Sequence, residues 1–390
     1  MDQPAQIQLQ VLRDQHHNEA NKEETMKQSS KTGHWWWWVK VSLYTLSVLL
    51  GQSVAVLLGR LYFLKGGSSN WLSSVVQVGG FPILIPFYLL TTTTPTKAAA
   101  GGVDHDHDDQ GAKPPLPSPH TLTAIYALLG LVVGFDCWLY SVGLQNLPVS
   151  TYTLLSASQL AFNSFFSYFI NGQKFTPFVV NSLVLLTISS VLLVFNNDDD
   201  DDSSAAGPTS RVKYVTGFLC TLAASALFGL LMSATQYVFT SVIKRRTFKY
   251  VMDMIIYQNL FASLVTAVGL FASGEWKGIG REMEGYGLGT TSYLMTLIWI
   301  AVFWQVFSIG AVGLIFEVSA LFSNSISVVG LPVVPIAAIF FFHDKMSGVK
   351  GVSMVLAIWG FVSYVYQFYV DDRISKVAKK AVDESSPRSS

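Results

Sequence analysis

Side-chain amides recur inside the long apolar stretches of this 390-residue chain, and such groups can bind a polar solute. Gln159 and Asn163 are four residues apart, and Ser156 precedes Gln159 by three, so in one continuous helix all three share a face. Single amides stand in three other apolar stretches: Gln52, Gln305 and Asn324. A polar group inside a membrane is costly unless it is paired or faces a cavity, so these are candidate solute ligands. The alternative is that each only hydrogen-bonds a neighbouring helix.

Two carboxylates also fall in or beside apolar stretches. Glu317 is seven residues before Asn324, which predicts one shared helix face, and Asp136 is four residues before Tyr140. Burial disfavours the charged form of a carboxyl group, so such a group can gain and lose a proton during transport. We predict that Glu317 couples the proton, because it shares a face with a candidate ligand. The alternative is Asp136, for which a structural hydrogen bond with Tyr140 is also possible.

The composition indicates a membrane protein. Hydrophobic residues make up 51% of the chain and charged residues 13%, with a mean hydropathy of +0.40. Soluble domains carry about a quarter charged residues, so this chain has too little polar surface to cover a globule in water. The net charge is zero, which gives no indication of a nucleic-acid partner. The two cysteines, Cys137 and Cys220, lie in apolar stretches and form no disulfide framework or metal motif.

Ten apolar stretches approach the roughly 20 residues that a membrane-spanning helix needs. They lie near 39–63, 71–90, 121–143, 148–170, 177–195, 213–240, 250–272, 292–313, 315–342 and 348–370, with four tryptophans, 35–38, just before the first. We predict an all-α polytopic membrane protein. Its expected parts are a disordered cytosolic tail (1–38), a first five-helix repeat (39–195), an acidic outer loop (196–212), a second five-helix repeat (213–370) and a cytosolic C-terminal tail (371–390).

The two halves show a faint internal repeat. The predicted fourth span follows Gly143-Leu144 and precedes Gln173-Lys174, and the ninth follows Gly313-Leu314 and precedes Asp344-Lys345. An odd number of spans per half inverts the second unit relative to the first. Inverted repeats are typical of secondary transporters, with the solute site between the repeats near mid-membrane.

The distribution of basic residues predicts the orientation. With a cytosolic N-terminus, 17 of the 25 Lys and Arg residues fall on the inner side. Four of them cluster at 244–249, in a short loop, where the rule is strongest. Both termini are therefore predicted to be cytosolic. The Asp/His run at 104–109 is interpreted as a solvated acidic loop; weak binding of a transition metal is the alternative.

The absence of certain residues and motifs from the sequence argues against several classes of function. No Lys or Arg lies in the middle of a predicted span, so an anionic or phosphate-bearing solute lacks the cation that usually receives it. The chain contains no H-E-x-x-H, G-x-S-x-G or P-loop pattern. We therefore predict a carrier driven by a gradient rather than an enzyme or an ATP-driven pump, and no cofactor.

The same residues stand in segments that resemble the plant purine permease family, within the drug/metabolite transporter superfamily. The matching segments cover most of 40–370. They include 59–63 (GRLYF), 80–82 (GFP), 147–152 (LPVSTY), 157–163 (ASQLAFN), 257–258 (YQ), 269–276 (GLFASGEW), 313–317 (GLIFE), 321–324 (LFSN), 330–335 (GLPVVP), 343–346 (HDKM) and 358–361 (IWGF). The long N-terminal tail and the Asp-rich loops depart from the family pattern.

The resemblance implies proton-coupled uptake of adenine, cytokinins and related bases, at the plasma membrane of a plant cell. Some members of the family take alkaloids or forms of vitamin B6. The alternatives are a same-fold carrier for another small uncharged heterocycle or an amino acid, a vacuolar or endoplasmic reticulum location, and a membrane receptor without transport. The expected partners are a small-molecule substrate, protons and the lipid bilayer.

For a purine base the candidate residues have definite roles. A side-chain amide can pair with the N6/N7 edge of adenine, and an aromatic ring stacks on the face of a base. We expect three amides to read the edge and Trp304 to cover the ring; the amides are Gln159, Asn163 and Asn324. Further candidates at the same site are Gln52, Tyr140, Gln305 and Glu317.

Overall fold

A computed structural model of the chain describes residues 35–86, 118–172, 208–244 and 248–330, with isolated residues elsewhere as far as Tyr366. The secondary structure within these residues is entirely helical. Five helices are long and apolar enough to cross a membrane: Trp35–Leu64, Pro119–Asn146, Arg211–Ile243, Lys249–Ser273 and Thr290–Glu317. They coincide with predicted spans one, three, six, seven and eight, so these five spans are confirmed by length and composition.

Much of the rest of the prediction lies outside the described residues. This holds for most of the fifth and tenth spans, for the Asp/His run at 104–109, for the acidic loop at 198–202 and for both tails. The second span is described in part. Helix α2 (Asn70–Gly79) begins at the N-cap Ser69, and a 3₁₀ turn, η1 (Phe81–Leu84), follows it. Pro82 has no N–H for an α-helical hydrogen bond, which accounts for the tighter turn.

The first helix begins earlier than the sequence predicted. Trp35–Trp38 form its first turn instead of preceding it. Three of the four rings, those of Trp35, Trp36 and Trp38, are largely exposed. An exposed tryptophan collar at the end of an apolar helix fits the interface belt of a membrane protein.

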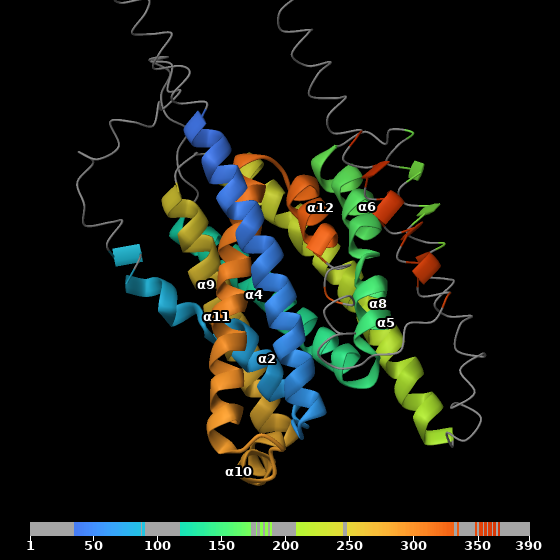
Figure 1. Cartoon of the computed structure of the whole chain (residues 1–390). Coiled ribbons are helices and arrows are strands. Elements are labelled where there is room, and N and C mark those ends of the chain that lie inside the picture. Colours follow the sequence, from blue (N-terminus) through green and yellow to red (C-terminus); the bar gives the residue numbers. More distant parts are fainter. Residues whose placement is uncertain are drawn as a thin grey trace, which may run out of the picture.

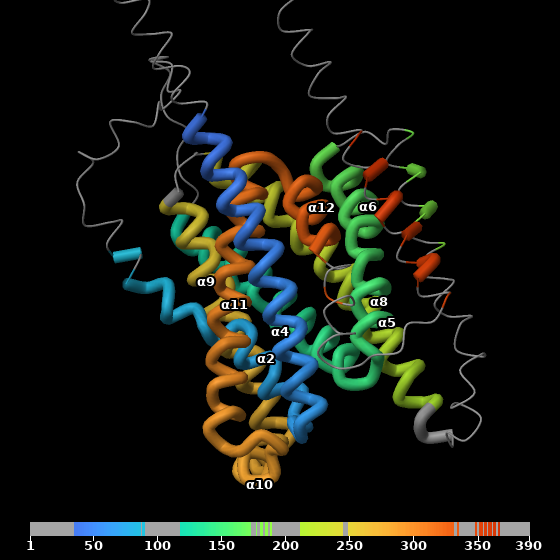
Figure 2. The backbone as a smooth tube through the Cα atoms, viewed as in Figure 1, coloured from blue at the N-terminus to red at the C-terminus, as the bar shows by residue number. Residues whose placement is uncertain are grey.

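The helices lie in two groups side by side (Figures 1 and 2). The first group comprises the Trp35–Leu64 helix, α2, α4 (Pro119–Asn146), α9 (Phe248–Ser273) and α11 (Thr290–Glu317). The second comprises α5 (Val149–Ser156), α6 (Gln159–Asn171), α8 (Pro208–Tyr237) with its π-helical continuation η3 (Val238–Ile243), and α12 (Ala320–Gly330). Helix α4 packs against both α8 and α9, so it connects the two groups.

The predicted fourth span is two helices rather than one. Helix α5 ends at Ser156 and α6 begins at Gln159, with a turn at Ala157 and Ser158. In this turn the Ser158 N–H donates to the carbonyl of Leu155 at 3.1 Å, a bond over three residues instead of four. A 3₁₀ turn inside a longer helix changes the direction of side chains after it. The predicted single helix is therefore interrupted: Gln159 and Asn163 lie on α6, whereas Ser156 is the last residue of α5.

The boundary of the predicted ninth span is also wrong. Glu317 is the last residue of α11, and Val318 leaves the helical conformation with φ −126° and ψ −82°. Helix α12 then starts at Ala320, whose N–H donates to Oε1 of Gln236 at 2.9 Å. Glu317 and Asn324 lie on different helices, so the shared face that favoured Glu317 as the proton-coupling residue does not exist.

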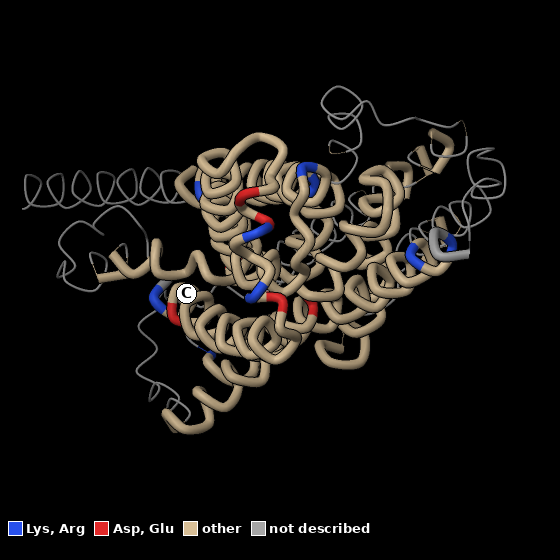
Figure 3. Tube along the Cα trace, turned by 90° about the horizontal axis from the view of Figure 1, so that it is seen from below, with Lys and Arg blue, Asp and Glu red and all other residues tan. Residues whose placement is uncertain are grey.

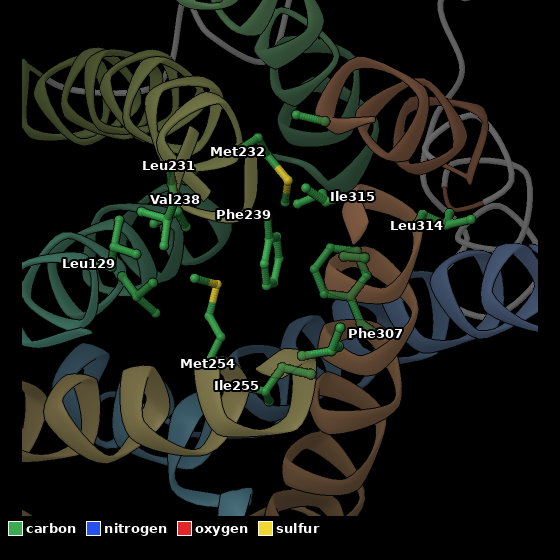
Figure 4. Close-up of a cluster of buried hydrophobic side chains, with 14 of the residues drawn as sticks. Leu129, Leu231, Met232, Val238, Phe239, Met254, Ile255, Phe307, Leu314 and Ile315 are labelled. Atoms are coloured by element: carbon green, nitrogen blue, oxygen red, sulfur yellow. The ribbon is translucent and has the colours of Figure 1, made fainter. Parts of the chain in front are cut away.

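An apolar cluster joins the two groups on one side (Figure 4). Its labelled members come from α4, α8, η3, α9 and α11: Leu129, Leu231, Met232, Val238, Phe239, Met254, Ile255, Phe307, Leu314 and Ile315. Close helix approach depends on glycine at several positions, of which Gly130 and Gly229 are examples. A Cβ on Gly130 would lie 2.6 Å from the Gln258 carbonyl of α9, and one on Gly229 would lie 2.6 Å from the Asn163 nitrogen of α6.

Figure 3 shows the molecule from below, the end at which α10 (Ile279–Glu284) lies in Figure 1. A carboxylate of this helix is buried. Glu282 is 8% exposed and accepts hydrogen bonds from the hydroxyls of Tyr62 and Tyr293. Its other oxygen accepts from the backbone N–H and hydroxyl of Ser68, at 3.0 and 2.9 Å, and from the N–H of Ser69. Glu282 thus fastens the segment before α2 and the Trp35–Leu64 helix to α10 and α11.

We expect Glu282→Ala to lower the stability of the protein. The substitution leaves the buried hydroxyls of Tyr62 and Tyr293 without their acceptor, and a hydrogen bond to a charged group contributes about 1.5–3 kcal/mol. A loss of at least about 2 kcal/mol is expected, seen as a lower midpoint of thermal unfolding in detergent. Glu284→Ala, at an exposed position on the same helix, is the control. Equal midpoints for the two variants contradict the prediction.

Candidate functional site

A chain of polar side chains crosses four helices where the two groups meet. The hydroxyl of Ser327 on α12 donates to Oε1 of Gln52 on the first helix at 2.7 Å. Nε2 of Gln159 on α6 donates to the same Ser327 oxygen at 3.2 Å. The hydroxyl of Tyr140 on α4 lies 3.3 Å from Oε1 of Gln159 and donates to it. Gln52, Ser327, Gln159 and Tyr140 are called the Gln159 chain below.

Helices α6 and α12 are linked by a reciprocal pair of hydrogen bonds. Nδ2 of Asn163 donates to the carbonyl of Ala320 at 3.3 Å, and Nδ2 of Asn324 donates to the carbonyl of Gln159 at 3.1 Å. Each asparagine thus donates to the backbone carbonyl of the residue that lies four positions before the other asparagine in the sequence. This is the relation that a two-fold axis between α6 and α12 would produce. It places two of the candidate amides on equivalent positions of the two helices.

The two asparagines differ in their amide oxygens. Oδ1 of Asn163 accepts from the hydroxyls of Ser233 at 2.8 Å and Ser167 at 3.3 Å. Oδ1 of Asn324 is buried and has no hydrogen-bond partner within the described part of the chain. A buried acceptor without a partner is unfavourable, and a ligand can satisfy it. Asn163 is therefore fixed to α8 and α12, whereas the amide oxygen of Asn324 has no protein partner among the described residues.

Trp304 and Gln305 belong to different surroundings although they are neighbours on α11. Trp304 is half-buried and packs against three apolar clusters, one of which also carries Tyr140 beside Leu155 and Val56. Phe307 meets the Trp304 ring edge-on, with centroids 5.3 Å apart. Trp304 thus packs against an apolar cluster that Tyr140 of the Gln159 chain also contacts.

Gln305 is part of a second polar network inside the first group. Its Oε1 accepts from Asn259 on α9 at 3.2 Å, and its Nε2 donates to the carbonyl of Gln77 on α2 at 3.3 Å. The network continues from Gln77 to Ser141 on α4 at 2.9 Å. These bonds join helices of a single group, which fits a structural role for Gln305 better than contact with a solute.

The two candidate carboxylates are in different environments. Asp136 on α4 is 4% exposed, and its Oδ1 has no partner among the residues that the structure describes. Tyr140 and Tyr152 are close enough to interact with its charge. Glu317 is partly exposed at the end of α11, near Tyr44 of the first helix. Asp136 is thus next to the Gln159 chain, and Glu317 is at a helix terminus.

Sequence reasoning missed several hydroxyl residues that complete the site. Ser327 is central to the Gln159 chain, and Ser233 holds Asn163. A serine in a helix usually bonds its own preceding turn, so its type gives little indication of a contact between helices. The spacing could have indicated Ser327, because it is three residues after Asn324 and lies on the same side of α12.

Comparisons with known proteins identify the family of the chain. A family model described as purine nucleobase transmembrane transport matches residues 39–374. The chain belongs to the purine permease family. It is 53% identical over 349 residues to "Probable purine permease 10" of Arabidopsis thaliana, covering 90% of this chain and 85% of that protein. "Purine permease 21" of the same plant is 52% identical over 349 residues, with the same coverage.

Family membership makes the chain an integral membrane protein of a transporter family, not of an enzyme family. Within the described ranges no group of three His, Cys, Asp or Glu side chains is placed to hold a metal ion.

Proposed function

We propose that this protein is a proton-coupled importer of purine bases and their derivatives, among them adenine and cytokinins. Family membership supports the solute class, and one structural observation supports the location of the site. This observation is the buried Gln159 chain at the crossing of α6 and α12, where Oδ1 of Asn324 has no partner in the described structure. A neutral base with both donors and acceptors on its edge matches an environment of neutral amides.

The proposed site reads both the edge and the face of the base. Oδ1 of Asn324 accepts a hydrogen bond from an amino or ring N–H group. Gln159 can offer a second amide hydrogen and a second lone pair, because each of its polar atoms has one protein partner. Trp304 stacks on the ring, which contributes about 1–3 kcal/mol for a base on an aromatic side chain. Asn163 fixes α6 to α12 and does not contact the base.

Protonation of Asp136 provides the coupling in this proposal. The carboxyl group is buried on α4, one helical turn from Tyr140, and it is the candidate nearer to the Gln159 chain. The protein has ten spans in two inverted repeats, related by the axis between α6 and α12. Both termini are cytosolic, and the plasma membrane is the proposed location.

Uptake of labelled adenine by cells that express the chain tests the function. We expect accumulation above the outer concentration that is lost when a protonophore collapses the proton gradient. A competition panel of adenine, zeatin, nicotine, pyridoxine and nucleosides then ranks the solutes, with adenine and zeatin expected as the strongest competitors. Cells with a matched empty vector are the control. Uptake no higher than in these cells, for every solute of the panel, contradicts the proposal.

A further inference from the structure

Tyr140 lies between the buried carboxyl group and the candidate base site. It is one helical turn after Asp136 on α4, so the two side chains share a face of this helix. Its hydroxyl lies 3.3 Å from Oε1 of Gln159 and 3.4 Å from Oγ of Ser225 on α8. Ser225 donates its own proton to the carbonyl of Thr221 at 2.9 Å. Tyr140 is therefore the donor in both contacts.

The hydroxyl of Tyr140 can serve only one strong acceptor at a time, since it carries one proton. Both contacts are longer than the usual 2.7–2.8 Å of an O–H···O bond, so turning away from them costs little. A deprotonated Asp136 would be a stronger acceptor than either, because hydrogen bonds to an ionised group are about twice as strong as neutral ones, and its charge is close enough to interact with Tyr140. The structure shows Tyr140 turned to Gln159 and Oδ1 of Asp136 without a partner in the described region. This is the arrangement expected for a protonated Asp136.

Among the residues that the structure describes, the other titratable groups do not offer Asp136 a competing donor at this position. On its own helix the neighbours are Cys137 and Tyr140, and on α5 the neighbour is Tyr152. The titratable residues of the helices that pack on α4 are Arg211, Lys213, Tyr214, Cys220 and Tyr237 of α8 and Lys249, Tyr250, Asp253 and Tyr257 of α9; α2 carries none. The four lysine, arginine and aspartate residues among them lie near the helix ends, more than one turn from the level of Asp136.

We propose that Tyr140 is a positioning residue that transmits the protonation state of Asp136 to Gln159, and so couples the proton to the base. With Asp136 protonated, Tyr140 and Ser327 hold the Gln159 amide in one orientation that presents a hydrogen and a lone pair to the base. When Asp136 loses its proton, the Tyr140 hydroxyl turns to the carboxylate. Gln159 then loses one of its two fixed contacts and binds the base less tightly.

The direction of this coupling is that of a symporter. A proton on Asp136 raises the affinity for the base, and by linkage a bound base raises the affinity for the proton by the same factor. The two therefore enter together from the side with more protons. Tyr140 keeps its own proton throughout, and the transported proton moves onto and off the Asp136 carboxyl group. The inference rests on the proposed function and adds the residue through which its two parts communicate.

The test measures the affinity of full-length protein for labelled adenine as a function of pH, with Tyr140→Phe compared with the unmodified chain. One coupled proton changes the affinity by at most about tenfold per pH unit. We expect the affinity of the unmodified chain to fall as pH rises. Tyr140→Phe is expected to change less than about twofold over the same range and to stay at the weak, high-pH level.

Tyr152→Phe is the matched control. Tyr152 also lies beside Asp136, and its ring meets that of Tyr140 edge-on at 5.9 Å, but its hydroxyl interacts with Ser156 on its own helix. This variant should keep the pH dependence of the unmodified chain. A pH dependence that persists in Tyr140→Phe overturns the inference and leaves the proposed function intact. If the unmodified chain binds no base at any pH, the proposed function fails first and the inference fails with it.

Ser225→Ala supplies a second test that does not depend on the folding of Tyr140→Phe. The change removes the other acceptor of the Tyr140 hydroxyl and leaves Gln159 in place. If Tyr140 acts through Gln159, the pH dependence of the affinity survives in Ser225→Ala. If this pH dependence disappears in Ser225→Ala, the Tyr140 hydroxyl acts through Ser225 of α8, and the assigned connection to Gln159 is wrong.

Discussion

Asp136→Asn is expected to abolish the uphill accumulation of adenine. One coupled proton and a gradient of one pH unit supply about 1.4 kcal/mol, enough for about tenfold accumulation. Asparagine keeps the shape of a protonated aspartate but cannot release a proton, so the variant should equilibrate adenine without concentrating it. Exchange of inner for outer adenine should continue, because exchange does not require proton release. Uptake and exchange in proteoliposomes with a defined pH gradient measure both quantities.

Glu317→Gln is the matched comparison, since it makes the same chemical change in the other candidate carboxylate. Glu317 ends α11 and is partly exposed, so its loss of charge should leave accumulation nearly unchanged. The opposite pattern, with accumulation lost in Glu317→Gln and kept in Asp136→Asn, would assign the coupling to Glu317. Full accumulation in both variants would exclude carboxylate coupling at these two positions.

The sequence alone predicted the elements that are set by length and hydropathy. The Pro119–Asn146 and Thr290–Glu317 helices extend the predicted spans by a few residues only, because an apolar run of this length has one stable form in a membrane. Gln159, predicted as a solute ligand, lies at the centre of a polar network, and its role toward a solute stays a prediction. A buried amide must find partners, and these are on other helices.

The two helix breaks could not be predicted from local sequence. Neither the turn at 157–158 nor the one at 318–319 contains proline or glycine. The start of α12 depends on a tertiary contact, the hydrogen bond from the Ala320 N–H to Gln236 of α8. The local signal is weak: Ser319 accepts from the Phe322 N–H at 3.1 Å as an N-cap, but one serine inside an apolar stretch does not by itself indicate a helix start. This is why Glu317 was assigned to the wrong helix and its relation to Asn324 was misjudged.

The same limit applies to the roles of Asn163 and Asn324. Both are fully buried asparagines followed by serine, and both donate to a carbonyl of the other helix. Their difference arises on α8, where Ser233 occupies the amide oxygen of Asn163. A contact between positions 70 residues apart is set by helix packing, so the pattern within each helix predicted equal roles for the two.

This near-symmetry allows a controlled test of base recognition. Asn324→Ala removes one hydrogen bond between α6 and α12 and the open amide oxygen that we assign to the base. Asn163→Ala removes the equivalent bond between the helices but no proposed contact with the base. The loss of one polar contact corresponds to about 1–3 kcal/mol. We therefore expect the apparent affinity for adenine to weaken about 5- to 150-fold in Asn324→Ala only.

Both variants should lose some thermal stability, and Asn163→Ala more, because Ser167 and Ser233 also lose their acceptor. The affinities are therefore compared at equal amounts of folded protein in the membrane. An adenine affinity that is unchanged in Asn324→Ala removes this residue from the base site. An equal weakening in both variants indicates instead that the link between α6 and α12 controls binding through the helix arrangement. Only a selective loss in Asn324→Ala supports its open oxygen as the acceptor for the base.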